Sequence, residues 1–280
     1  MSYNYWNNFV NLWRTLPPIE YTNPAPVAPY NLLLGWGNPN LTPLLNSITI
    51  SDFSIQYLPE PWWGNNGVHV LNSVVINYNP GGGSGIQHNA HSGGLFGFAN
   101  YQSFADNEAT GATNHFAGTN RWHRSKRAIR IFNTLTRIGI PLHGHHNLQN
   151  HLSIELIPWH TPNSLTIGPY INANLQAIFD NCIVFSANES LRIQNTKLKN
   201  KVILRLNGNM TTNLLNDFVR HGICTYTIIN PIGYTPSTKG GFFKFKINSI
   251  QNVEFISIWG KIGNDFPPNV DMDWIFNNIV

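Results

Sequence analysis

The stretch Val68–Tyr78 (VHVLNSVVINY), followed directly by Asn79–Gly85 (NPGGGSG), decides how this chain begins to fold. Valine and isoleucine dominate its first part, and β-branched residues of this kind favour a strand. Proline and consecutive glycines then predict a tight turn with exposed backbone N–H groups. Such a turn can hold an anion or approach a ligand closely, although it also fits an ordinary connecting loop. The sequence therefore predicts a buried strand that leads into a glycine-rich loop.

Apolar strands alternate with amphipathic helices along the rest of the chain. The predicted strands are near-continuous apolar runs, typical of parallel strands that are buried on both faces: His151–Trp159, Lys201–Leu206 and Phe255–Trp259. Apolar residues at helical spacing predict four helices: Arg127–Ile138, Ile171–Cys182, Thr212–His221 and Asp271–Val280. We expect an α/β fold with three layers (helices, sheet, helices), built on a short, mainly parallel sheet of about four strands.

Local signals add detail to this fold. Thr211 or Thr212 would cap the start of the third helix, and Gly222 would end it. Thr225–Asn230 and Phe242–Ile247 predict an extra β-hairpin.

The first 57 residues predict an N-terminal segment with a character of its own. Asn4–Leu16 has one apolar helical face and is followed by two prolines that end it. Residues 21–45 are rich in proline and predict an extended arm that packs on the body, because their apolar side chains need burial. We expect residues 1–57 to form this helix and arm, and residues 58–280 to form one α/β domain.

Composition narrows the class of protein. The chain has 280 residues, of which 42% are hydrophobic and only 11% charged, with a formal net charge of +4, so global disorder is excluded. No apolar run reaches the roughly 18 residues of a membrane span, and the N-terminus lacks the pattern of a secretory signal. Cys182 and Cys224 are too few for a disulfide framework or a four-cysteine metal site. We therefore expect a cytoplasmic protein without a membrane partner, and the sequence does not indicate its oligomeric state.

Three short motifs resemble the uracil-DNA glycosylase superfamily, most of all its single-strand-selective and mismatch-specific branches and bacterial glycosylase-like proteins. In chain order they are Leu58–Asn65 (LPEPWWGN), Val74–Gly81 (VVINYNPG) and Ile154–His160 (IELIPWH). The resemblance covers most of residues 58–265. It implies a DNA glycosylase-like hydrolase that acts in base excision repair, removing uracil or a related damaged base from DNA by hydrolysis of the N-glycosidic bond. This reaction requires no metal and no other cofactor.

The resemblance also implies a set of site residues. Asn79 would be the catalytic residue, orienting the attacking water through its amide oxygen. The extruded base would lie among residues of the glycine-rich turn, an aromatic wall, the second core strand and the loop after the last core strand. These binding residues are Pro80, Gly81, Gly82, Phe96, Phe98, Glu155, His160 and Asn264. Ordinary core packing explains the two phenylalanines equally well.

The chain departs from the family's pattern at two points. The loop after the last core strand, Trp259–Pro268, has no histidine, so Lys261 or Asn264 would have to donate a hydrogen bond to the leaving base. Glu155 stands where relatives read the base with an asparagine, and a carboxylate accepts hydrogen bonds but does not donate them. These departures lead to a second hypothesis: a glycosylase-fold protein without catalysis that binds nucleic acid or a protein partner.

Clusters of basic side chains predict where DNA phosphates bind. The main cluster lies in Arg121–Arg127 and includes a tryptophan; its candidate contacts are Arg121, Arg124, Lys126 and Arg127. A solvated helix start is the alternative interpretation. Lys197, Lys199 and Lys201 form a second, weaker run.

The densest group of histidines lies at His143–His151. It motivates a third hypothesis, a metal-assisted hydrolase, but no carboxylate lies between Glu108 and Glu155 to complete such a site. The leading hypothesis therefore includes no metal.

Overall fold

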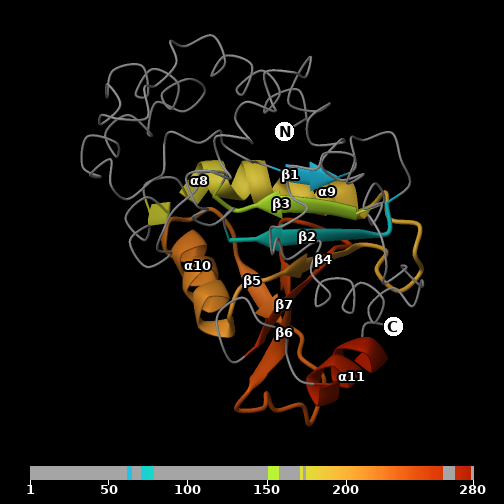
Figure 1. Ribbon diagram of the computed structural model, residues 1–280. Helices are drawn as coiled ribbons and strands as arrows, with labels where there is room; N and C mark the ends of the chain where they lie inside the picture. Colours follow the sequence, from blue (N-terminus) through green and yellow to red (C-terminus); the bar gives the residue numbers. More distant parts are fainter. Residues whose placement is uncertain are drawn as a thin grey trace, which may run out of the picture.

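The computed structural model of this chain describes residues 62–64, 71–78, 151–157, 171–172, 175–260 and 269–278. These residues form one mixed sheet with helices packed against it (Figure 1). The α/β class expected from the sequence is therefore present. The expected N-terminal helix and arm (residues 1–57) and the expected helix Arg127–Ile138 lie outside the described residues.

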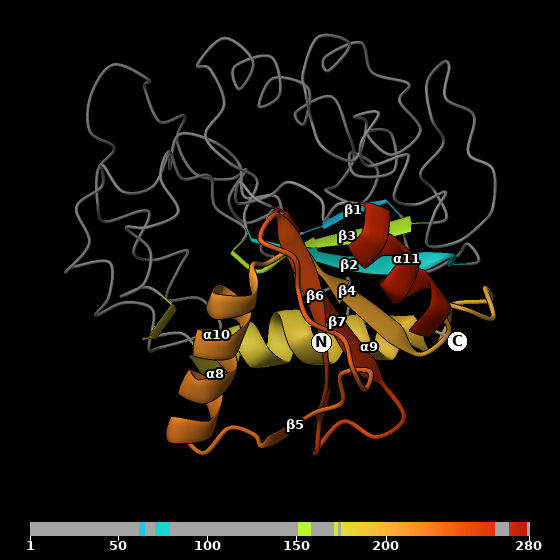
Figure 2. The ribbon, with the colours of Figure 1, turned by 90° about the horizontal axis from the view of Figure 1, so that it is seen from below.

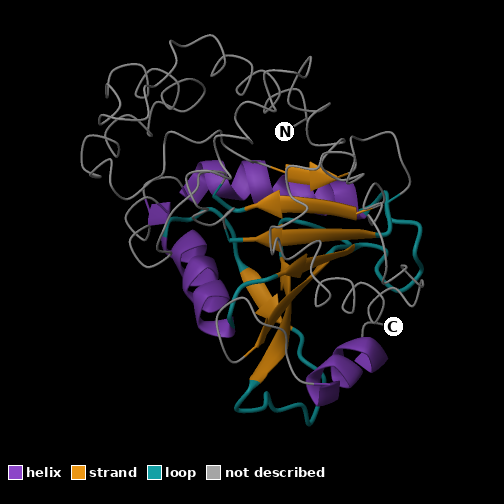
Figure 3. Ribbon diagram, viewed as in Figure 1, coloured by secondary structure: helices purple, strands orange, loops and turns teal. Residues whose placement is uncertain are grey.

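Seven strands make up the sheet, in the order β1-β3-β2-β4-β7-β6-β5 (Figure 3). Their bounds are β1 Trp62–Gly64, β2 Ser73–Asn77, β3 His151–Glu155, β4 Lys201–Leu204, β5 Tyr226–Ile228, β6 Gly240–Ile247 and β7 Glu254–Gly260. The four central strands, β3, β2, β4 and β7, are parallel to one another. β1 joins one edge antiparallel, and β6 and β5 extend the other edge antiparallel.

The expectation of about four strands is wrong for the sheet as a whole, although the parallel core matches it. The difference is the three antiparallel strands β1, β5 and β6, and in β6 the side chains of Phe242, Phe243 and Phe245 are all buried. A strand with apolar side chains on both faces is stable when it lies inside a sheet that is covered on both sides. β6 accordingly pairs with β7 as well as with β5. The expected hairpin forms as β5 and β6, but it continues the main sheet instead of standing apart.

Two helical stretches and a C-terminal helix are described. The first stretch runs without a break through α8 Leu175–Ile178, the π-helical segment η5 Phe179–Val184 and α9 Phe185–Ser190. The others are α10 Gly208–Arg220 and α11 Asn269–Asn278. The first stretch ends at Ser190 and not at the expected Cys182, because Phe185 and Ala187 continue its buried face.

The ends of α10 show how local residues set a helix. Its N-cap is Asn207, whose Oδ1 accepts a hydrogen bond from the Met210 N–H at 2.8 Å. The expected threonine cap is therefore wrong, and Thr212 instead donates to the Gly208 carbonyl within the first turn. The expected stop at Gly222 is confirmed: its φ is 70°, and the N–H groups of Gly222 and Ile223 donate to carbonyls of the last turn.

Helices cover both faces of the strands β6 and β7. On one face, the Ser257 hydroxyl lies 2.8 Å from the Thr211 hydroxyl of α10. On the other face, Lys244 donates to the Asn278 carbonyl of α11 at 2.9 Å. Lys244 is the register partner of Ile256, so it lies on the face opposite to that of Ser257. Figures 1 and 2 accordingly show α10 and α11 on either side of β6 and β7.

Candidate functional site

Four buried polar residues gather where the parallel strands end. We call them the carboxyl-edge cluster: Asn77, Ser153, Glu155 and Arg205. Asn77 ends β2, Glu155 ends β3 two residues after Ser153, and Arg205 follows β4 directly. Their exposed fractions are only 4 to 7%. In open α/β sheets, ligands bind outside the carboxyl ends of the parallel strands, so this edge is the place to expect a site.

Strand register places these four residues on one face of the sheet. Asn77 is the register partner of Glu155, and their side chains therefore point the same way. Pairing continues past the strand ends: the Leu156 N–H donates to the Asn77 carbonyl at 2.8 Å, and the Arg205 N–H donates to the Ile76 carbonyl at 2.8 Å. Three strands that lie far apart in the sequence are thereby held in a single alignment at this edge.

The amide of Asn77 is the centre of the carboxyl-edge cluster. Its Nδ2 donates to Ser153 Oγ at 2.5 Å and to Glu155 Oε1 at 3.2 Å. Its Oδ1 accepts a hydrogen bond from Arg205 Nη1 at 3.1 Å. A flipped amide would turn its NH₂ toward the guanidinium and its oxygen toward the carboxylate, so these partners determine its orientation. Asn77 thus connects a buried anion to a buried cation.

This connection explains how two ionised side chains remain in the interior. An isolated buried charge is costly unless it is paired and hydrogen-bonded. Glu155 and Arg205 carry opposite charges and share Asn77 as a hydrogen-bonded bridge. The negative charge of Glu155 also acts on Cys182 in the π-helical segment η5. Burial is the larger cause that raises the pKa of the Cys182 thiol, and the charge of Glu155 raises it further. The cluster therefore brings hydrogen-bond acceptors and donors together at one edge of the sheet.

Tyr78 follows Asn77 at the point where the chain leaves β2. Its carbonyl accepts a hydrogen bond from the Ile157 N–H at 3.0 Å, and its side chain is 9% exposed. Burial raises the pKa of Tyr78 to about 12, so the phenol stays neutral at physiological pH. The described part of this strand ends at Tyr78, one residue before Asn79.

Of the site residues predicted from the sequence, Glu155 is the one that the structure describes. It ends β3, is buried and is hydrogen-bonded to Asn77, and its role in reading a base stays a prediction. The other predicted site residues lie outside the described residues: Asn79, Pro80, Gly81, Gly82, Phe96, Phe98, Arg121, Arg124, Lys126, Arg127, His160 and Asn264.

Sequence reasoning missed three members of the cluster. Asn77, Ser153 and Arg205 each interrupt an otherwise apolar strand or follow it directly. A polar residue at the carboxyl end of a buried strand is the signal that could have found Asn77 and Arg205. Ser153 has no such signal, because a small hydroxyl side chain is common within strands.

A second buried carboxylate joins α11 to the connection between β5 and β6. Asp271 is 2% exposed and accepts hydrogen bonds from the hydroxyls of Tyr234 and Ser237, both at 2.8 Å. Burial and this hydrogen bond raise the pKa of Tyr234. Each carboxylate oxygen of Asp271 accepts a hydrogen bond from a hydroxyl of the protein. We therefore infer that Asp271 is structural and holds the first turn of α11 against the connection between β5 and β6.

The part of the chain that the structure describes has neither a cluster of metal ligands nor a membrane-spanning helix. No group of three or more metal-ligating side chains occurs there. Within the His143–His151 group, only the backbone of His151, the first residue of β3, is described. No helix among the described residues is long and apolar enough to cross a membrane.

Comparisons of this chain with protein-family models, with curated proteins and with solved structures found no match. The resemblance to uracil-DNA glycosylases therefore stays a prediction. The geometry of the carboxyl edge is the structural observation that bears on it.

Proposed function

We propose that this chain is a DNA glycosylase-like hydrolase that removes uracil or a related damaged base from DNA. The observation that carries the proposal is the buried carboxyl-edge cluster, located where β2 leads toward Asn79. In an α/β sheet of this kind, that edge is where a ligand binds. The proposed three-layer architecture is supported by α10 and α11, which cover opposite faces of the sheet.

The proposed chemistry divides between recognition and hydrolysis. Glu155 supplies acceptors and Arg205 supplies donors at one edge, which is complementary to a base edge with neighbouring N–H and C=O groups. Asn79 orients the water that attacks the sugar carbon as the glycosidic bond breaks and the base leaves as an anion. Asn264 or Lys261 donates to that anion, in place of the histidine that relatives use.

The proposed DNA path is set by charge. Arg121, Arg124, Lys126 and Arg127 bind backbone phosphates, and Phe96 and Phe98 stack on the extruded base. In this proposal His160 forms part of the rim of the base pocket. No metal or other cofactor takes part in this scheme.

The test measures base release from defined oligonucleotides. Single- and double-stranded DNA with one uracil is incubated with the protein in the presence of a chelator, and abasic sites are detected by alkaline cleavage. We expect cleavable product from the natural chain and a loss of about 100-fold or more in Asn79→Ala, since a single positioned group typically contributes that much. The matched control is Asn213→Ala, an exposed position of α10, which should retain full activity.

Two outcomes would contradict the proposal. One is the absence of abasic product from any damaged base offered, and the other is equal activity of Asn79→Ala and the natural chain. Activity that appears only with added Zn²⁺ or Mn²⁺ would instead favour the metal-assisted hydrolase with the His143–His151 group.

A non-catalytic protein that uses the same fold to bind nucleic acid is the second candidate. The observation that favours it is the mutual hydrogen bonding of Asn77, Glu155 and Arg205, which can serve as a brace between strands. Salt-sensitive binding of oligonucleotides without base release would support this candidate.

A further inference from the structure

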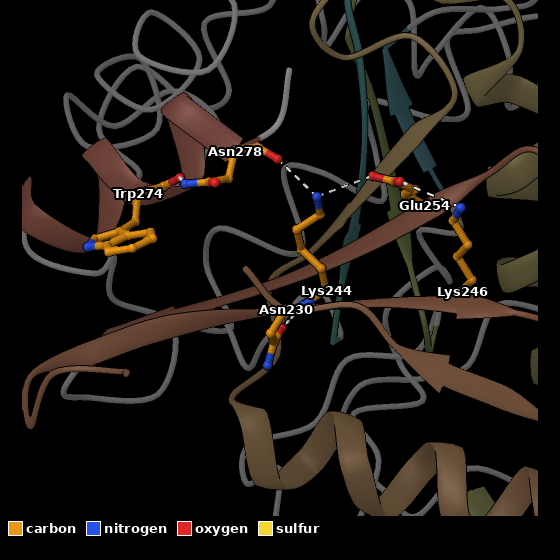
Figure 4. A network of polar contacts seen from close by, with 6 residues as sticks. All are labelled: Asn230, Lys244, Lys246, Glu254, Trp274 and Asn278. Atoms are coloured by element: carbon orange, nitrogen blue, oxygen red, sulfur yellow. Dashed lines mark hydrogen bonds and ion pairs between the residues drawn. The ribbon is translucent and has the colours of Figure 1, made fainter. Parts of the chain in front are cut away.

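Three lysines lie around one carboxylate at the amino edge of the sheet, opposite the carboxyl-edge cluster, and two more, Lys197 and Lys199, directly precede β4 in the chain. Glu254 begins β7 and is the register partner of Lys201, which begins β4. From β6, the amino groups of Lys244 and Lys246 lie 3.5 and 3.8 Å from the Glu254 carboxylate (Figure 4). We call the whole group the amino-edge lysines: Lys197, Lys199, Lys201, Lys244 and Lys246.

The charge at this edge is not balanced within the described residues. Glu254 ion-pairs with Lys244 and with Lys246, so these two ammonium groups share one carboxylate. The nearby Glu189 is already paired with Arg192. The pKa of Lys201 is lowered, mainly by burial. The negative charge of Glu254 opposes this shift, and the positive charge of Lys244 adds to it, so Lys201 lies close to another cation. Three ammonium groups thus lie in the field of this one carboxylate.

Two of the five lysines have structural roles. Lys244, whose side chain is 11% exposed, donates to the Asn278 carbonyl in the last turn of α11 at 2.9 Å (Figure 4). The amino group of Lys197 lies 4.0 Å from the centre of the Phe276 ring. Both interactions hold α11 against the sheet. The outward charge therefore comes from Lys246, which is 51% exposed, from the exposed Lys199 and from the partly exposed Lys201.

We propose that the amino-edge lysines bind the backbone phosphates of a single-stranded nucleic acid. A lysine is a compact point charge that attracts phosphate without needing a fixed orientation. Lys201 and Arg205 lie four residues apart along β4 and on the same face, about 13 Å from each other. Ile203, which lies between them on this face, is buried, so the phosphates bind at the amino edge and not along β4. The choice of nucleic acid as the polyanion rests on the proposed function.

The first test measures binding without catalysis. A fluorescent single-stranded oligonucleotide with undamaged bases is titrated with the protein over a range of salt concentrations, and anisotropy reports affinity. The double variant K199Q/K246Q should bind severalfold more weakly, and its log–log salt dependence should be shallower by about 1.4, since each lost phosphate contact of a single strand contributes about 0.7. The matched control is Lys239→Gln, an exposed lysine beside Gly240 at the opposite end of β6.

A second variant separates charge from structural damage. Glu254→Gln removes the shared carboxylate but keeps the shape of the side chain. It should bind the oligonucleotide severalfold more tightly, whereas partial unfolding would weaken binding. Circular dichroism confirms that each variant remains folded.

The proposal is overturned if K199Q/K246Q retains the natural affinity and salt dependence, or if Glu254→Gln binds no more tightly. It is also overturned if poly-glutamate competes as well as unlabelled oligonucleotide at equal charge, a result that would indicate an acidic peptide as the partner. Because the probe carries no damaged base, failure of base release leaves this measurement unaffected, and loss of binding at the lysines does not by itself abolish hydrolysis at Asn79.

Discussion

Arg205 Nη1 donates a hydrogen bond to Asn77 Oδ1 at 3.1 Å, although 128 positions separate the two residues in the chain. The contact joins the ends of two adjacent parallel strands, β2 and β4. It also places a guanidinium beside an amide whose NH₂ group already contacts Glu155. The stability of the carboxyl edge therefore depends on the opposite charges of Glu155 and Arg205 and on the Asn77 amide that connects them.

The first prediction concerns the loss of one charge from this trio. Arg205→Met should lower the free energy of unfolding by about 3 kcal/mol or more, because it leaves Glu155 buried without its compensating cation. The double variant Glu155→Gln/Arg205→Met should be less destabilised than the single one, since the uncompensated anion is gone. Denaturant unfolding measures both. A double variant that is no more stable than Arg205→Met would contradict this prediction.

The second prediction concerns the start of α10. Asn207→Ala removes the side-chain oxygen that accepts from the Met210 N–H, and it should cost about 1 kcal/mol in unfolding free energy. Asn213→Ala, on an exposed position of the same helix, serves as the control and should be neutral or slightly stabilising, because alanine favours a helix interior. An unchanged stability in Asn207→Ala would rule out the cap.

The third prediction concerns the end of α10. Gly222 has a φ of 70°, and a Cβ added there would meet nothing within 4 Å. Gly222→Ala should therefore cost about 1 kcal/mol through backbone strain alone. Gly222→Asn should cost less, since asparagine tolerates this conformation better. Equal losses for both variants, measured by thermal unfolding, would argue against a purely conformational effect.

The fourth prediction concerns stability at high pH. Burial and the hydrogen bond to Asp271 raise the pKa of Tyr234, and burial raises the pKa of Tyr78 to about 12. Between the ordinary tyrosine pKa of 10 and these higher values, the folded state binds more protons than the unfolded state. The stabilisation is thus complete below about pH 10 and is lost as the pH rises above it.

Denaturant unfolding from pH 8 to pH 11.5 tests this dependence. Tyr234→Phe should be less stable at neutral pH, because Asp271 loses a donor, yet its stability should fall less steeply above pH 10. A slope identical to that of the natural chain would show that Tyr234 ionises normally in the folded state.

The fifth prediction concerns the two thiols. Cys182 and Cys224 are 2% and 8% exposed, and burial raises the pKa of each. The thiolate is the reactive form, so neither should react with a maleimide reagent at pH 7 while the protein is folded. Both should react after addition of denaturant. Mass spectrometry of the labelled chain gives the count, and rapid labelling of the folded protein would contradict the burial.

The helical and parallel parts of this fold could be predicted because their signals are local. Lys201–Leu204 and Glu254–Gly260 lie in apolar runs that only burial on both faces explains, and Gly222 marks a helix end by its conformational freedom. The start of α10 could not be predicted in this way, because Asn207, Thr211 and Thr212 all offer a capping oxygen within a few residues. The choice among them depends on where the chain leaves β4.

The sequence by itself determined the α/β class and the apolar core strands, with Glu155 inside one of them. Tertiary structure alone decided that Glu155 and Arg205 both contact Asn77, and that Lys244 and Lys246 share Glu254. The physical reason is register. Side chains alternate along a strand with a period of two, so the alignment of neighbouring strands determines which charges come together, and that alignment is set by packing across the whole sheet.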